Sequence, residues 1–189
     1  YMQADILNLG KLGKKFDIIE SSGVLHHMDE PITGWRVLND CLESGGLMRI
    51  GLYSELARQY IVKMQEEIGQ SGIGSSDNAI KLFRTDVINS DKTHHERILT
   101  FEDFYSLSTY RDLLFHVQEH LFTIPQIKDC LSELGLKFCG FEGDKTVLDF
   151  KLMNTGTDDP YDLDKWNSYE QVNPHAFAGM YQFWCQKVT

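Results

Sequence analysis

The order of apolar and polar positions predicts alternating strands and a helix in the first part of the chain. Residues 1–7 (YMQADIL) and 16–20 (FDIIE) are short apolar runs typical of buried strands, and residues 47–53 (LMRIGLY) form another. Residues 33–42 carry apolar side chains at helical spacing and are followed by two glycines. A strand, a helix and a second strand within about 40 residues are typical of a βαβ crossover, so the sequence predicts an α/β fold with a parallel sheet.

From residue 54 onwards the spacing of apolar residues becomes helical. Residues 54–69, with Ser54 as a candidate cap, are expected to form a helix, as are residues 79–88 and 100–108. A polar stretch at 89–97 separates the last two, and its histidines, His94 and His95, are expected to be solvated. The pattern then predicts a helix from Pro125 to Gly135, a strand at 136–142, a short helix near 164–170 and a final strand at 179–188.

Composition and charge exclude several classes of function. The chain has 189 residues, with 18 Lys and Arg against 28 Asp and Glu, which gives a net charge of -10. This acidity disfavours binding to nucleic acid. The apolar stretches are much shorter than the roughly 20 residues of a membrane-spanning helix, so no membrane association is expected. The four cysteines are widely spaced, which is typical of a protein of the reducing cytoplasm.

The turn after the strand at 16–20 is a candidate ligand-binding site. Ligands of open parallel sheets bind beyond the carboxyl ends of the strands. Ser21, Ser22 and Gly23 offer small side chains there, and Gly23 tolerates unusual backbone angles. The loops that contain Asp5 and that follow Tyr53 are expected at the same edge.

One run of residues carries a family resemblance. The segment FDIIESSGVLHHMDEPITGWRVLNDCLESGGLMRIGLYSE resembles the fourth strand, loop, helix and fifth strand of class I S-adenosylmethionine-dependent methyltransferases, with Glu30 where the common form has Asp. Residues 1–7 resemble the third strand of that fold, and the last two predicted strands resemble its sixth and seventh. The resemblance implies a Rossmann-like sheet truncated at its N-terminus. It divides the chain into the distal part of the core (1–54), a helical insertion between strands five and six (55–124), and a final helix with strands six and seven (125–189).

The resemblance also implies a cofactor and residues that bind it. S-adenosylmethionine is the implied cofactor, and methyl transfer to an unidentified small-molecule or peptide-like acceptor is the implied reaction. The acid after the third strand corresponds to Asp5, which would accept a hydrogen bond from adenine beside Ile6. Ser21, Ser22 and Gly23 correspond to residues that line the methionine part.

Candidates for catalysis and acceptor binding follow in the loops and the insertion. A histidine can act as a general base near neutral pH, and aromatic residues and arginines after the fifth strand suit acceptor recognition. The catalytic candidates are His26, His27 and Tyr53, and the acceptor-binding candidates are Arg58, Tyr60, Arg84, Arg111 and His116.

The sequence departs from the family in lacking a glycine-rich loop after a first strand. We therefore expect impaired cofactor binding by this chain, and an unpaired edge on the strand at 16–20. Either residues 1–7 occupy the vacant place, or two copies pair there as a homodimer. A non-catalytic binding or oligomerisation module that keeps the methyltransferase fold is the alternative.

A short motif suggests a remote further alternative. His116, Glu119 and His120 match the H-x-x-E-H pattern of inverted zinc metallopeptidases, in which two histidines bind zinc and the glutamate acts as base. No third ligand is identifiable, so a zinc hydrolase stays a remote alternative and no metal site is assigned.

Overall fold

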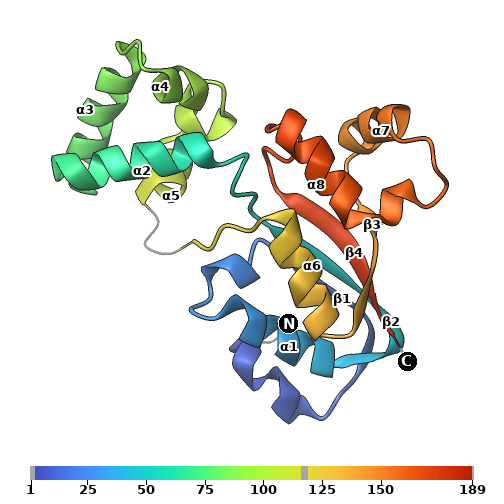
Figure 1. Cartoon of the computed structure of the whole chain (residues 1–189). Coiled ribbons are helices and arrows are strands. Elements are labelled where there is room, and N and C mark those ends of the chain that lie inside the picture. Colours follow the sequence, from blue (N-terminus) through green and yellow to red (C-terminus); the bar gives the residue numbers. More distant parts are fainter. Residues whose placement is uncertain (1–2, 116–118, 189) are drawn as a thin grey trace. The chain divides into compact units, whose positions relative to one another are not determined.

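The computed structural model describes residues 3–115 and 119–188 (Figure 1). The chain divides into two compact units. The first comprises Tyr1–Ala57 and Gln118–Thr189, and the second comprises Arg58–Val117. In the part of the chain that the structure describes, no helix combines the length and the apolar character needed to cross a lipid bilayer.

The first unit is built on a four-stranded sheet in the order β1-β2-β4-β3. Its strands are β1 (Phe16–Ser22), β2 (Leu42–Leu52), β3 (Leu136–Phe141) and β4 (Tyr181–Lys187). β1 and β2 are parallel, whereas β4 runs antiparallel to both of its neighbours. The strands predicted near residues 16–20, 47–53, 136–142 and 179–188 are therefore confirmed, and the mixed α/β class with them.

One face of this sheet forms the main core with four helices. These are α1 (Pro31–Asp40), α6 (Ile124–Glu133), α7 (Asp144–Met153) and α8 (Leu163–Val172). Alternate residues of β2 and β4 are fully buried on this face, and they share one apolar cluster with Trp35 and Trp166. The period of two in the strands and the apolar face of each helix explain why these segments pack together.

Local signals fix the ends of α6. Thr123 and Gln126 form a capping box at its start, in which each side chain bonds the backbone N–H of the other residue. Gly135 ends the helical segment with a φ of 64°, a conformation that glycine adopts without steric cost. The predicted helix between Pro125 and Gly135 is confirmed.

The N-terminal segment corrects one prediction. Residues 3–7 do not form a strand: Ile6–Leu12 is a 3-10 helix (η1), and the Asp5 carboxylate caps it by accepting a hydrogen bond of 2.9 Å from the Leu7 N–H. Residues 1 and 2 lie outside the described residues. A buried strand needs partners on its edge and cover on its faces, whereas a helical turn satisfies its own backbone and lets Ile6 and Leu9 pack against the core.

β1 is an edge strand. In the described chain it pairs with β2 alone, so neither residues 3–7 nor any other segment occupies the place beside it. Phe16 is 41% exposed and Ile18 is 57% exposed. The unpaired edge expected from the sequence is therefore present in the described residues, with apolar side chains along it.

The second unit is helical and has its own core. Its helices are α2 (Gln59–Ser71), α3 (Asp77–Ile88), α4 (Thr93–Ile98), η3 (Glu102–Tyr105) and α5 (Leu107–Phe115). Residues from all five form one apolar cluster. The helix predicted at 79–88 is confirmed, whereas the single helix predicted at 100–108 is wrong: extended backbone at Ser106 separates η3 from α5.

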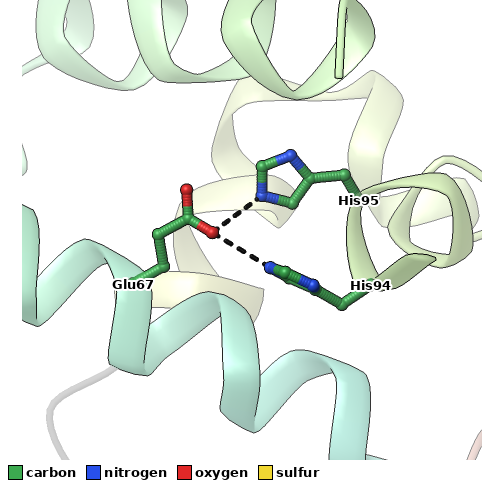
Figure 2. A group of neighbouring side chains, drawn as sticks. All are labelled: Glu67, His94 and His95. Atoms are coloured by element: carbon green, nitrogen blue, oxygen red, sulfur yellow. Dashed lines mark hydrogen bonds and ion pairs between the residues drawn. The ribbon is translucent and has the colours of Figure 1, made fainter. Parts of the chain in front are cut away.

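The polar stretch at 89–97 also differs from the prediction. It contains most of α4, and His95 is only 2% exposed. His94 and His95 both lie with Nε2 3.0 Å from the Glu67 carboxylate on α2 (Figure 2). The expectation that both histidines are solvated is therefore wrong, because a carboxylate 28 residues away in sequence allows His95 to be buried with a polar partner.

A buried polar cluster ties three segments of the first unit together. The Glu170 carboxylate, 2% exposed, accepts hydrogen bonds from the Tyr181 hydroxyl at 2.6 and 2.7 Å and from the Ser54 hydroxyl at 2.7 Å. Ser54 Oγ in turn accepts a bond of 3.0 Å from the Ala57 N–H. Burial raises the pKa of Glu170, and the two hydroxyl donors only partly oppose this.

Removing the Glu170 carboxylate is expected to destabilise the first unit strongly. Glu170→Ala would leave the buried hydroxyls of Ser54 and Tyr181 without an acceptor, at a cost of about 2–4 kcal/mol in the free energy of unfolding. Urea denaturation followed by circular dichroism measures this. Glu133→Ala is the matched control, because it breaks the exposed ion pair with Arg36 and should cost about 1 kcal/mol or less. Equal losses in the two variants would contradict the prediction.

The raised pKa of Glu170 predicts a dependence of stability on pH. The native state binds the Glu170 proton more tightly than the unfolded state, so this residue's contribution to stability is present at low pH. It is lost as pH rises from the ordinary value of 4.5 through the raised pKa. Glu170→Gln cannot titrate. The free energy of unfolding of the wild type minus that of Glu170→Gln should therefore fall across this window, and a difference that is constant with pH would exclude the effect.

Candidate functional site

The carboxyl ends of β1 and β2 meet at one edge of the sheet. The two strands are parallel, and their register pairs Ser21 with Ile50 and Ser22 with Gly51. Beyond the last pair, the Gly23 N–H donates a hydrogen bond of 3.3 Å to the Gly51 carbonyl. The turn Ser21–Gly23 therefore lies directly beside the end of β2, where ligands of open α/β sheets bind.

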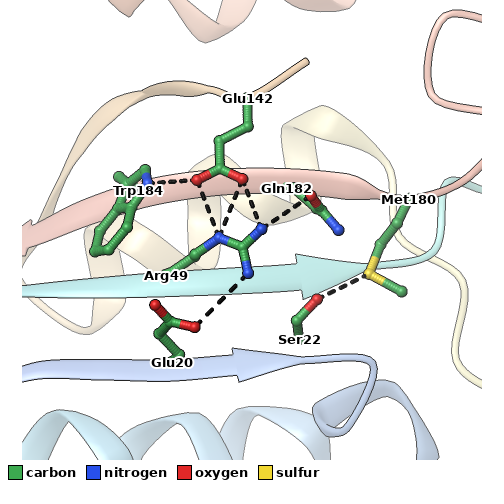
Figure 3. Close-up of polar contacts among 7 residues, drawn as sticks. All are labelled: Glu20, Ser22, Arg49, Glu142, Met180, Gln182 and Trp184. Carbon is green, nitrogen blue, oxygen red and sulfur yellow. Dashed lines mark hydrogen bonds and ion pairs between the residues drawn. The ribbon is translucent and has the colours of Figure 1, made fainter.

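This edge is tightly packed around two glycines. Gly23 has a φ of 74°, which a residue with a side chain adopts only with strain. A Cβ on Gly51 would collide with Ser22 Oγ and with Met180 Sδ, which lie 3.5 Å from each other (Figure 3). Gly51 and Met180 belong to the site but were not among the sequence-based candidates.

The Ser21 hydroxyl has an unusual position. Ser21 is 5% exposed, and in the part of the chain that the structure describes its Oγ has no hydrogen-bond partner. Buried hydroxyls are usually paired, so an unpaired one at the end of a strand is a group that a bound ligand or water can satisfy.

Three aromatic side chains lie together after these strands. The ring centroids of His26 and Tyr53 are 4.0 Å apart, and those of His26 and His27 are 4.3 Å apart. The segment before α6 fixes the backbone of this group, because the His120 N–H donates to the His26 carbonyl at 2.8 Å and the Phe122 N–H to the Tyr53 carbonyl at 2.9 Å. His26 is fully buried, whereas His27 and Tyr53 are half-buried.

A charged network crosses the sheet face opposite the main core. The Arg49 guanidinium donates to both oxygens of Glu142, at 2.7–3.0 Å, and to the Gln182 side chain at 3.0 Å (Figure 3). The Trp184 indole also donates to Glu142, at 2.6 Å, and Glu20 lies 3.8 Å from Arg49. The hydrogen bonds from Arg49 are the main reason that the pKa of Glu142 is lowered. The network joins β1, β2 and β4 to the residue that follows β3.

The two residues predicted to hold adenine belong to the start of the N-terminal helix η1. Asp5 caps η1 and Ile6 packs against the core, and in the described chain neither has a hydrogen bond to the Ser21–Gly23 turn. Their predicted role in cofactor binding stays a prediction. The position expected for Asp5 at the end of a third strand is wrong, because that strand is not formed.

The acceptor-binding candidates Arg58, Tyr60, Arg84 and Arg111 belong to the second unit. Arg84 lies over the Phe104 ring at 5.5 Å, and Arg111 forms an ion pair with Asp77. Arg97 and Lys63 each lie 5.8 Å from the Tyr60 ring, and Arg58 is buried. The structure therefore shows structural partners for several of these side chains, and their role with an acceptor stays a prediction.

The zinc-peptidase motif is only partly visible. His116 lies outside the described residues, so neither its acceptor-binding role nor the triad with Glu119 and His120 can be described. The His120 backbone N–H, as noted, bonds to His26. The zinc-hydrolase alternative stays untested.

Comparisons with known proteins find a curated relative in sequence and similar solved structures. No family model matches the chain. A curated relative, an uncharacterized protein of Synechococcus sp., is 27% identical over 183 residues, which is 91% of this chain and 44% of that protein. The chain thus spans less than half of that relative's length.

Two solved structures are similar over 97% of this chain and 37% of theirs. They are PKMT2 from Rickettsia typhi, with a TM-score of 0.64 and 14% identity, and the same protein in complex with AdoHcy, with a TM-score of 0.59 and 16% identity. At this level of identity the likeness establishes the fold, and the described chain therefore has the mixed α/β fold of the corresponding part of PKMT2.

Proposed function

We propose that this chain is part of an S-adenosylmethionine-dependent methyltransferase and forms one wall of its cofactor site. The observation that carries the proposal is the likeness over 97% of the chain to PKMT2, which has been solved in complex with AdoHcy, the product that S-adenosylmethionine leaves after methyl transfer. The chain spans 37% of the length of those structures. The activity of the whole protein is therefore part of the proposal.

The proposed wall is the edge where β1 and β2 end. The left-handed turn at Gly23 allows a ligand to approach the main chain closely, and Gly51 lets Ser22 and Met180 pack against the end of β2 beside it. Ser21 offers a buried hydroxyl without a partner in the described chain, which suits the polar end of the methionine moiety. When bound, S-adenosylmethionine supplies an activated methyl group, so the task of these residues is to hold it in place and to exclude water.

The aromatic group of His26, His27 and Tyr53 lies on the acceptor side in this proposal. His27 and Tyr53 are half-buried and are the members that an acceptor can reach. A histidine there can accept a proton from a nucleophile at neutral pH. In this proposal the acceptor is a small molecule or a peptide-like nucleophile that reaches these two side chains.

A nuclear magnetic resonance titration tests the cofactor wall even if binding is weak. With S-adenosylhomocysteine at millimolar concentration, we expect shifts in the backbone amide signals of Ser21, Ser22, Gly23 and Gly51, and none in those of the second unit's helices. Ser21→Ala should weaken binding at least threefold, because it removes a buried hydroxyl available to the ligand. Since that hydroxyl has no partner in the described chain, the thermal stability should be nearly unchanged.

Ser132→Ala is the matched control for this titration. Ser132 is exposed on α6, so its replacement should change neither binding nor stability. The proposal is wrong if saturating ligand leaves the amide signals of residues 21–23 and 51 unshifted. It is also wrong if the ligand shifts the amide signals of the second unit's helices equally.

Self-association through β1 is the second candidate function. The exposed side chains of Phe16 and Ile18 and the free edge of β1 in the described chain support it, because such edges pair readily with other strands. In this alternative the chain keeps the fold and acts as an oligomerisation module.

A lysine on this edge should prevent such pairing. We expect Ile18→Lys to weaken dimerisation of the chain at least tenfold in sedimentation equilibrium, because a charge on an edge strand opposes strand addition. Ile88→Lys is the control, since Ile88 is similarly exposed, at 54%, on α3 of the second unit. A wild-type chain that stays monomeric at all concentrations would rule out this candidate.

A further inference from the structure

Three potential metal ligands converge between α2 and α4 of the second unit. Glu67 comes from α2, and His94 and His95 come from the first turn of α4. The two imidazoles point their Nε2 atoms at the same carboxylate oxygen, Glu67 Oε2, each at 3.0 Å (Figure 2). One ligand atom from each of the three residues lies within 4.8 Å of the others.

The spacing of these atoms is close to that of a tetrahedral metal centre. Zinc binds histidine nitrogen and carboxylate oxygen at about 2.0–2.2 Å, which puts neighbouring ligand atoms about 3.3 Å apart. The observed Oε2 to Nε2 separations of 3.0 Å need to widen by only a few tenths of an ångström to admit the ion. We propose that Glu67, His94 and His95 bind a divalent transition-metal cation such as zinc, and that water occupies the fourth coordination position.

Burial and hydrogen bonds shift the pKa values of Glu67 and His95. Burial opposes ionisation of Glu67, but hydrogen bonds from Lys92, His94 and His95 outweigh it and lower its pKa to about 2. Burial lowers the pKa of His95, and the nearby carboxylate only partly opposes this. The same hydrogen bonds hold the carboxylate and the two imidazoles together in one cluster.

The surroundings hold further buried polar atoms. Nδ1 of His95 and the hydroxyl of Tyr110 are buried, and neither has a hydrogen-bond partner in the part of the chain that the structure describes. Burial raises the pKa of the Tyr110 hydroxyl, and the charge of Arg84 opposes this. The negative charge of Glu67 raises the pKa of Tyr110 further, which shows that the two groups lie close together. Unpaired buried polar atoms of this kind commonly bind water, and a hydrated ion brings water with it.

Lys92 competes with the cation for the same carboxylate. Its ammonium lies 2.8 Å from Glu67 Oε1, the oxygen that does not face the imidazoles. The Lys92 side chain is 52% exposed, so it can swing into solvent when a metal binds. Without metal, Lys92 and the imidazoles stabilise the Glu67 charge; with metal, the ion takes over and links α2 to α4.

Zinc titration of the tag-free chain, after treatment with EDTA and desalting, tests the site. Isothermal titration calorimetry with zinc chloride should show one ion bound per chain and a rise in the melting temperature. Cobalt(II) at the same site should give the visible absorption of a tetrahedral complex. His94→Gln and Glu67→Gln, which keep polar side chains of similar size, should each weaken zinc binding at least tenfold.

Two further variants distinguish zinc binding at this site from zinc binding by other histidines and from a general loss of stability. His175→Gln removes an exposed histidine of the first unit and should leave zinc affinity unchanged. Lys92→Met removes the competing ammonium and should raise zinc affinity several-fold. Absence of zinc binding by the wild type, equal binding by His94→Gln and Glu67→Gln, or no gain in Lys92→Met would each overturn the proposal. The test does not depend on methyl transfer, so it is independent of the proposed function.

Discussion

The first unit depends on the insertion of its last strand between two others. β4 pairs with β2 on one side and with β3 on the other, so the sheet is continuous only once residues 181–187 are in place. Its alternate residues Tyr181, Phe183 and Cys185 are fully buried in the main core. Because Tyr181 also bonds to Glu170, the strand is fixed by a polar contact as well as by apolar packing.

The same insertion shapes the candidate site. Met180 immediately precedes β4, and the position of that strand beside β2 brings its sulfur against Ser22 and Gly51. The parallel pairing of β1 with β2 supplies the remaining residues of the site, because it brings the carboxyl ends of both strands to one edge of the sheet. The site is therefore assembled from residues that lie far apart in sequence, and its geometry follows from strand order and direction.

Sequence patterns predicted the parts of the fold that local spacing determines. The short apolar run at residues 47–53 and the helix-start signals around Pro125 were sufficient, because each depends on neighbouring residues. The segment 3–7 was misread, since its apolar character is shared by strands and by helical turns that pack on a core. Helix α7 was missed because several of its apolar side chains, among them Leu148 and Leu152, are exposed and give no clear apolar face. Met180 could not be predicted, because nothing local indicates its contact with Gly51.

Two carboxylates show how partners, more than burial, decide what a buried acid can do. Glu170 is surrounded by neutral hydroxyl donors, so burial prevails and raises its pKa. Glu67 faces an ammonium and two imidazoles, so hydrogen bonding prevails and lowers its pKa to about 2. A carboxylate surrounded by hydroxyl donors serves as a structural acceptor, whereas one that two histidine nitrogens approach at 3.0 Å has the geometry of a metal ligand. Glu170 therefore stabilises the sheet unit, and Glu67 is the residue through which the helical unit can respond to a cation.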